Sequence, residues 1–99
     1  MLEQGLISFY LSKVQTIGVR ALAGEDYQKP IQSVMAEALA HLGSIKTSDP
    51  QKNLKAMAGQ LTLLAEHAPP SQAPYRATAD YAAQLVHRHL DAPQADPRA

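Results

Sequence analysis

The side chains best suited to chemistry in this 99-residue sequence are its four histidines. Imidazoles bind metal ions and transfer protons near neutral pH, but both roles need partners at a suitable spacing. His87 and His89 lie two residues apart, which on a helix separates their directions by about 200°, so they cannot hold one ion. His41 follows Glu37 by four residues and can share its helix face, where we expect a hydrogen bond or a solvated pair rather than catalysis. His67 is expected at a helix end, where a cationic ring suits the helix dipole.

His89 differs from the other histidines in its position on the expected last helix. It falls on the apolar side of that helix, together with Ala82, Leu85 and Val86. One hypothesis is a buried, pH-sensitive group or a ligand contact, in which His89 and Tyr75 would anchor a small molecule between helices. We favour the alternative, a last-turn histidine that its neighbours partly cover and that is hydrogen bonded to a carbonyl.

The remaining polar residues form no pattern that would mark an enzyme. Carboxylates are spread over expected helix starts, ends and polar faces, where capping and solvation account for them. The spacing marks no Ser-His-Asp or Ser-Lys arrangement, and there is no glycine-rich phosphate loop. The sequence has no cysteine, which excludes thiolate zinc sites and disulfides and fits a reducing cytoplasm. We therefore expect a cytoplasmic protein that is not an enzyme and holds no metal or cofactor.

The charge balance argues against nucleic acid as a partner. Nine basic and nine acidic residues cancel, so the chain lacks the positive excess that drives binding to phosphate backbones. Lys52 and Lys55 follow an expected helix start, as basic residues do in a recognition helix. The alternative function is thus a dimeric nucleic-acid-binding transcriptional regulator that presents helix 50–67. We interpret the two lysines instead as an exposed, solubilising pair.

The elements that would position these residues are all expected to be helices. Apolar residues make up 45% of the chain, alanine and leucine dominate, and no stretch alternates with the period of a strand. The apolar spacing predicts helices over residues 2–23, 30–45, 50–67 and 75–90.

Helix ends are marked by residue types that favour them. Gly24 tolerates the left-handed conformation that follows many helices, and Pro30 suits a first helical turn. Either Asp49 caps the third helix with Pro50 at its first position, or Ser48 caps it in a capping box. The prolines near residue 70 end that helix.

Short connections between helices imply antiparallel neighbours. The expected fold is therefore all-α, with four short helices in an up-down-up-down bundle, and a looser orthogonal packing is the alternative. We predict one helical domain over residues 1–91 and a disordered tail over residues 92–99, which contains two prolines and no apolar anchor. No segment approaches the ~20 apolar residues of a membrane span, so no membrane partner is expected.

The apolar side of the first helix is wider than one-sided packing requires, and Leu63 lies off the apolar stripe of the third helix. We therefore predict a small, non-enzymatic interaction module of adaptor, inhibitor (immunity-type) or regulatory kind. It would bind another protein and self-associate, at least as a homodimer. The alternative is that the first helix fills the groove of the other three. The residues predicted to form the interface are Leu6, Phe9, Tyr10, Val14 and Ile17.

Overall fold

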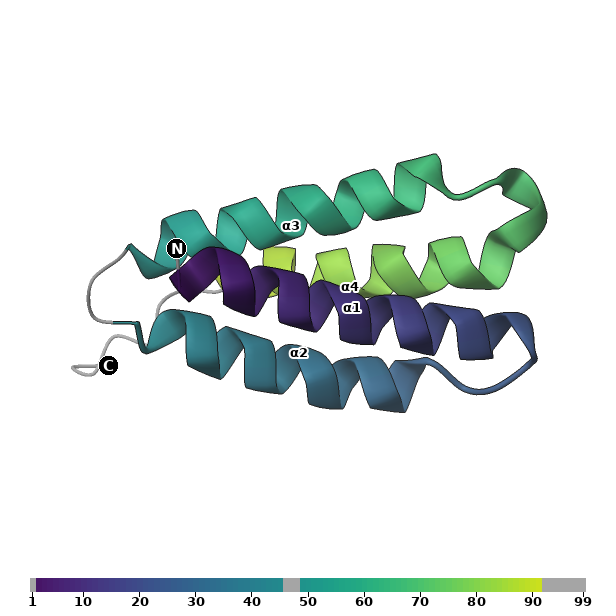
Figure 1. Cartoon of the computed structure of the whole chain (residues 1–99), viewed down its shortest axis with the longest axis horizontal. Coiled ribbons are helices and arrows are strands. Elements are labelled where there is room, and N and C mark those ends of the chain that lie inside the picture. The colour runs from purple at the N-terminus through teal and green to yellow at the C-terminus, as the bar shows by residue number, and fades with distance from the viewer. Residues whose placement is uncertain (1, 46–48, 92–99) are drawn as a thin grey trace.

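The chain forms four α-helices in the predicted order, in a computed structural model that describes residues 2–45 and 49–91. They are α1 (Leu2–Leu22), α2 (Gln28–Gly43), α3 (Pro50–His67) and α4 (Ala73–Asp91), with the short 3-10 turn η1 (Pro70–Gln72) before α4. Successive helices run in opposite directions along the bundle, so α1 and α3 point the same way (Figure 1). The prediction of an all-α, four-helix bundle is confirmed. The predicted tail lies outside the described residues.

Two of the predicted helix ends have the expected chemistry. The Asp49 side chain accepts a hydrogen bond of 3.0 Å from the backbone N–H of Gln51, and Pro50 occupies the first turn of α3. This confirms the first of the two predicted caps, and Ser48 lies outside the described residues. Gly24 follows α1 with φ of 93°, a left-handed conformation that other residues adopt at a cost.

Two helices begin earlier than the apolar spacing predicts. The carboxylate of Asp26 accepts hydrogen bonds from the backbone N–H groups of Gln28 (3.2 Å) and Lys29 (3.3 Å), so α2 starts before Pro30. Similarly, the backbone N–H of Gln72 donates to the carbonyl of Pro69 at 2.8 Å, and this turn leads directly into α4. Polar contacts in the connections therefore set these starts, and they leave no mark on the apolar pattern.

The core lies along the axis of the bundle, and α4 contacts all three other helices. Helix α2 contributes the stripe that its sequence predicts, with Ile31, Met35, Ala38 and Leu42 buried. Among the four helices, α1 and α3 have the least contact with each other. The core residues are Ile7, Tyr10, Val14, Ile31, Met35, Ala38, Leu42, Leu54, Met57, Ala58, Leu61, Ala82, Ala83 and Val86.

No helix among the described residues is long and apolar enough to cross a membrane.

Candidate functional site

The five residues predicted to form an interface do not share one surface. Tyr10 and Val14 are each 1% exposed and belong to the core, so they offer no surface to a partner in this fold. Leu6 and Ile17 are partly buried and pack against the same core. Only Phe9 is open to solvent, at 52% exposure. The wide apolar side of α1 is therefore largely explained by its contacts with α2 and α4, whereas the contact with α3 that the alternative hypothesis also required is small.

Phe9 is exposed but has neighbours of its own. Its ring meets the ring of Tyr10 edge-on, with centroids 5.1 Å apart, and the ammonium of Lys13 lies 4.9 Å from its centroid. A lysine over an aromatic ring is attracted by the electrons of the ring face. These contacts cover part of Phe9 and reduce the apolar area that it offers to a partner.

Tyr10 and His41 form a polar contact that the sequence analysis missed. The Tyr10 hydroxyl is hydrogen bonded to Nδ1 of His41, which lies on α2 beside the buried tyrosine. Burial, and then the nearby carboxylate of Glu37, raise the pKa of Tyr10 above its ordinary value of 10.0. The predicted role of His41 as a hydrogen-bonding residue is confirmed, but its partner is Tyr10. A buried tyrosine needs a hydrogen-bond partner for its hydroxyl, and this requirement could have predicted a polar residue beside Tyr10.

The histidines of α4 lie in different surroundings. His89 is exposed, and the expected hydrogen bond to a carbonyl does not occur among the described residues. Although His89 lies on the apolar side of α4, no neighbouring helix covers it there. Its proposed companion Tyr75 packs elsewhere, against Gly18 of α1. His87 lines a groove. The sequence analysis considered this residue only as a partner of His89 in a metal site and excluded that pair.

A first groove runs between α1 and α3, where these helices have little contact. It encloses about 400 Å³, and its apolar lining consists of Leu11, Leu63 and Leu64. Leu63 is 51% exposed, in agreement with its predicted position off the core stripe. The polar lining residues carry no carboxylate, lysine or arginine: they are Gln15, Gln60 and His67.

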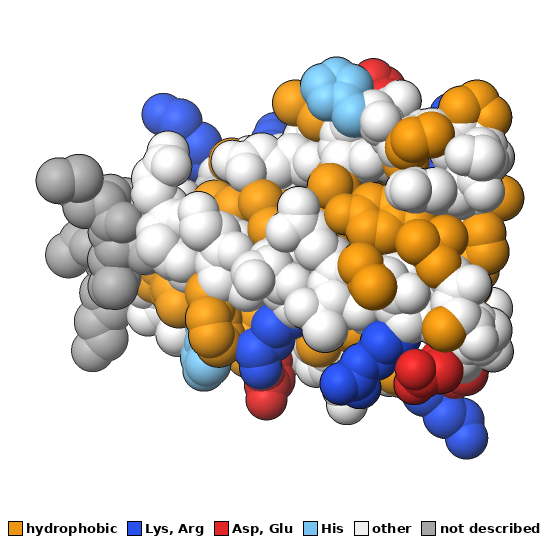
Figure 2. Space-filling view, turned by 45° about the vertical axis from the view of Figure 1, so that its right-hand side comes forward, with side chains coloured by type: hydrophobic (Ala, Val, Ile, Leu, Met, Phe, Trp, Pro, Cys, Tyr) orange, Lys and Arg blue, Asp and Glu red, His pale blue; other side chains and the backbone are white. Residues whose placement is uncertain are grey.

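Apolar surface continues from this groove towards the end of the bundle. Leu22 lies on the same side of α1 as Leu11, and it is 41% exposed, with Val19 beside it at 59%. Figure 2 turns this end of the bundle forward and shows hydrophobic side chains gathered there. Leu22 and Val19 are two of the large apolar residues that the described part of the chain exposes.

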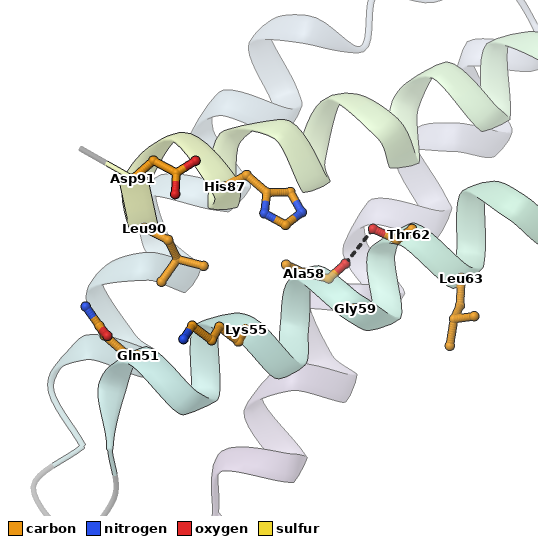
Figure 3. Close-up of a pocket in the computed structure, with 9 residues that line it drawn as sticks. All are labelled: Gln51, Lys55, Ala58, Gly59, Thr62, Leu63, His87, Leu90 and Asp91. Atoms are coloured by element: carbon orange, nitrogen blue, oxygen red, sulfur yellow. Dashed lines mark hydrogen bonds between the residues drawn. The ribbon is translucent and has the colours of Figure 1, made fainter.

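A second groove of about 600 Å³ lies between α3 and α4 (Figure 3). Lys55 and Gln51 border it from α3, and the His87 ring projects over it from α4. Thr62 donates its hydroxyl to the carbonyl of Ala58 at 2.9 Å, one turn earlier on the same helix. The lining residues are Gln51, Lys55, Ala58, Gly59, Thr62, Leu63, His87, Leu90 and Asp91.

Within residues 2–45 and 49–91, no group of three or more His, Asp or Glu side chains could hold a metal ion. Lys52 and Lys55 are both exposed near the start of α3, and Lys55 borders the second groove. Both grooves are concave surfaces that can bind a partner, and a smaller one of about 260 Å³, which Ile17 lines, lies between α1 and α2.

Comparisons of the chain with models of known families, with curated proteins and with solved structures found no match.

Proposed function

We propose that this protein is a non-enzymatic interaction module that binds an amphipathic helix of a partner protein in the groove between α1 and α3. The observation that carries the proposal is the separation of these two helices over an apolar groove with a half-exposed Leu63 at its edge. A small bundle normally closes such a gap by packing its own helices together. Here the chain leaves it open.

The shape of the groove favours a helix as the bound element. Its two walls are helices that run in the same direction, and a third helix can lay its apolar stripe between them (Figure 1). The groove has no charged carboxylate, lysine or arginine in its lining, so the partner needs leucine-like residues at spacings of three and four rather than a matching charge. Exposed Leu22 and Val19 extend the contact beyond the groove.

A protein partner also suits the chain as a whole. The formal net charge is zero, which gives no long-range attraction for nucleic acid. We propose self-association as well: in the absence of the partner, a second copy of the chain would place a helix in the same groove. We also propose the cytoplasm as the compartment.

The test replaces Gln60 at the rim of the groove with a photo-crosslinking benzoylphenylalanine and identifies the captured protein by mass spectrometry. The variant Leu63→Asp puts a charge into the groove, whereas Phe9→Asp changes an equally exposed residue outside its lining. We expect capture to be lost with Leu63→Asp and retained with Phe9→Asp. Equal capture by both variants would contradict the groove as the binding surface, and capture of the chain itself would identify a second copy as the occupant.

A further inference from the structure

We infer that the groove between α3 and α4 is a second binding site, which takes a small organic monoanion with an apolar body. The acidic group would lie between Lys55 and His87, and the apolar body would rest on α3 over Gly59. This site is separate from the proposed helix-binding groove, because only Leu63 lines both. A failure of one proposal therefore leaves the other standing.

Gly59 leaves the α3 side of this groove without a side chain. Glycine in the interior of a helix destabilises it relative to alanine, so a mid-helix glycine calls for a reason in the packing. Gly18 of α1 has one: a Cβ there would come within 2.8 Å of the Tyr75 ring. At Gly59 a Cβ would meet no atom within 4 Å, so nothing in the described chain requires glycine. Because Gly59 has no side chain, the floor of the groove stays open at this position.

The polar groups around this floor suit an anion. The ring of His87 projects into the groove from α4, and the Lys55 side chain runs along α3 with its ammonium towards Gln51 (Figure 3). Neither side chain forms a hydrogen bond or ion pair with another described residue. Both can donate hydrogen bonds to an acidic group. The hydroxyl hydrogen of Thr62 is already donated to Ala58, so the donors left are those of Lys55, His87 and Gln51.

The remaining lining sets the class of ligand. Leu90 enters the groove beside His87, and Ala58 adds apolar surface on α3 (Figure 3). Leu63 lines the edge that this groove shares with the first one, and its side chain points away from α4. Asp91 at one end repels a second negative charge. A volume of about 600 Å³ lies within the range of small-molecule sites. The fitting class is a carboxylate or sulfonate with an aromatic or branched apolar body.

The probe for this site is anilinonaphthalene sulfonate, whose fluorescence rises in apolar surroundings. N-phenylnaphthylamine has the same ring system without the acid and serves as the uncharged comparison. We expect saturable binding of the sulfonate to the folded wild-type protein, with a lower Kd than that of the uncharged analogue. Equal Kd values for the two probes would overturn the assignment of an anion.

Two pairs of variants locate the binding. Gly59→Leu fills the floor, and Gly5→Leu is its control, because a Cβ at Gly5 also meets nothing within 4 Å and Gly5 lines neither groove. Lys55→Gln removes the charge, and Lys52→Gln removes an exposed charge one turn away. We expect Gly59→Leu to raise the Kd of both probes, and Lys55→Gln to raise only that of the sulfonate, by roughly tenfold. Both controls should bind as the wild type does.

Thermal unfolding of each variant separates loss of the site from loss of the fold. Gly59→Leu is expected to keep or raise Tm, because leucine is the better helix former and its Cβ enters open space. Wild-type affinity in Gly59→Leu, together with an intact fold, would overturn the proposed location. A sulfonate Kd that rises equally in Lys52→Gln and Lys55→Gln would show a diffuse charge effect and no site.

Discussion

The hydroxyl of Tyr10 on α1 is hydrogen bonded to Nδ1 of His41 on α2, across 31 positions of sequence. Tyr10 is 1% exposed, so its hydroxyl would otherwise be cut off from water. Whether the hydroxyl donates to Nδ1 or accepts from it depends on the tautomer of the His41 ring. Either way, the contact lets a large aromatic residue fill the core, and no buried side-chain N or O atom among the described residues lacks a partner.

A double-mutant cycle measures this contact. We expect Tyr10→Phe and His41→Ala to show a coupling of about 1 kcal/mol in the free energy of unfolding, typical of a hydrogen bond at the edge of a core. Urea denaturation of the two single variants and the double variant gives the value. The control cycle uses Tyr81→Phe and Gln32→Ala, which remove the exposed 2.7 Å hydrogen bond between those side chains. A coupling as large in the control would mean that the burial of Tyr10 adds nothing.

Stability should fall at alkaline pH because the pKa of Tyr10 is raised in the folded state. Below the ordinary value of 10.0 the tyrosine is neutral in both states, so it adds no pH dependence. Above it, the unfolded chain loses the proton first, which favours unfolding until the folded-state pKa is passed. We expect the free energy of unfolding of Tyr10→Phe to decline less than that of the wild type as the pH rises above 10.0. Parallel curves for the two proteins would contradict this.

The two mid-helix glycines should respond oppositely to alanine. At Gly18 a Cβ would press on the Tyr75 ring at 2.8 Å, and overpacking of this kind costs about 1–3 kcal/mol, which exceeds the gain in helix propensity. At Gly59 only that gain remains, so Gly59→Ala should stabilise the protein by roughly 0.5–1 kcal/mol. Chemical denaturation measures both. In a Tyr75→Ala background the effect of Gly18→Ala should change sign, because the ring is gone.

Substitutions of Val14 and Phe9 should have very different effects on stability, because the first residue lies in the core and the second on the surface of α1. Val14→Asp places an unpaired charge in the core, which is costly enough to unfold a domain whose total stability is about 5–15 kcal/mol. Phe9→Asp changes a residue that is 52% exposed and should cost only about 1 kcal/mol. Circular dichroism and thermal unfolding of both variants check this. A folded Val14→Asp protein of reduced molar mass would instead restore α1 as an oligomer interface.

Much of the fold follows from signals that act within a few residues. The stripe from Ile31 to Leu42 predicts α2, and its residues are buried. The Asp49 cap and the prolines after His67 bound α3 as predicted, because a cap or a proline acts on the backbone next to it. Four short-linked helices with apolar stripes then pack as a bundle.

The candidate sites were decided by the packing of the helices against one another. An apolar arc gives the direction of a side chain from its own helix, whereas burial depends on which other helix covers it. The arc of α1 therefore predicts Tyr10 and Phe9 as one surface, yet the structure buries the first and exposes the second. The same limit applies to α4, where His89 points to solvent and His87 into a groove.

By itself, the sequence determined the helices, their order and most of the core, because these depend on local backbone preferences and on apolar spacing. Only the tertiary structure decided where the bundle stays open. The gap between α1 and α3, the groove over Gly59 and the contact between Tyr10 and His41 each join residues far apart in the chain. Their formation depends on how all four helices rotate and approach together, and no local pattern encodes that balance of packing energies.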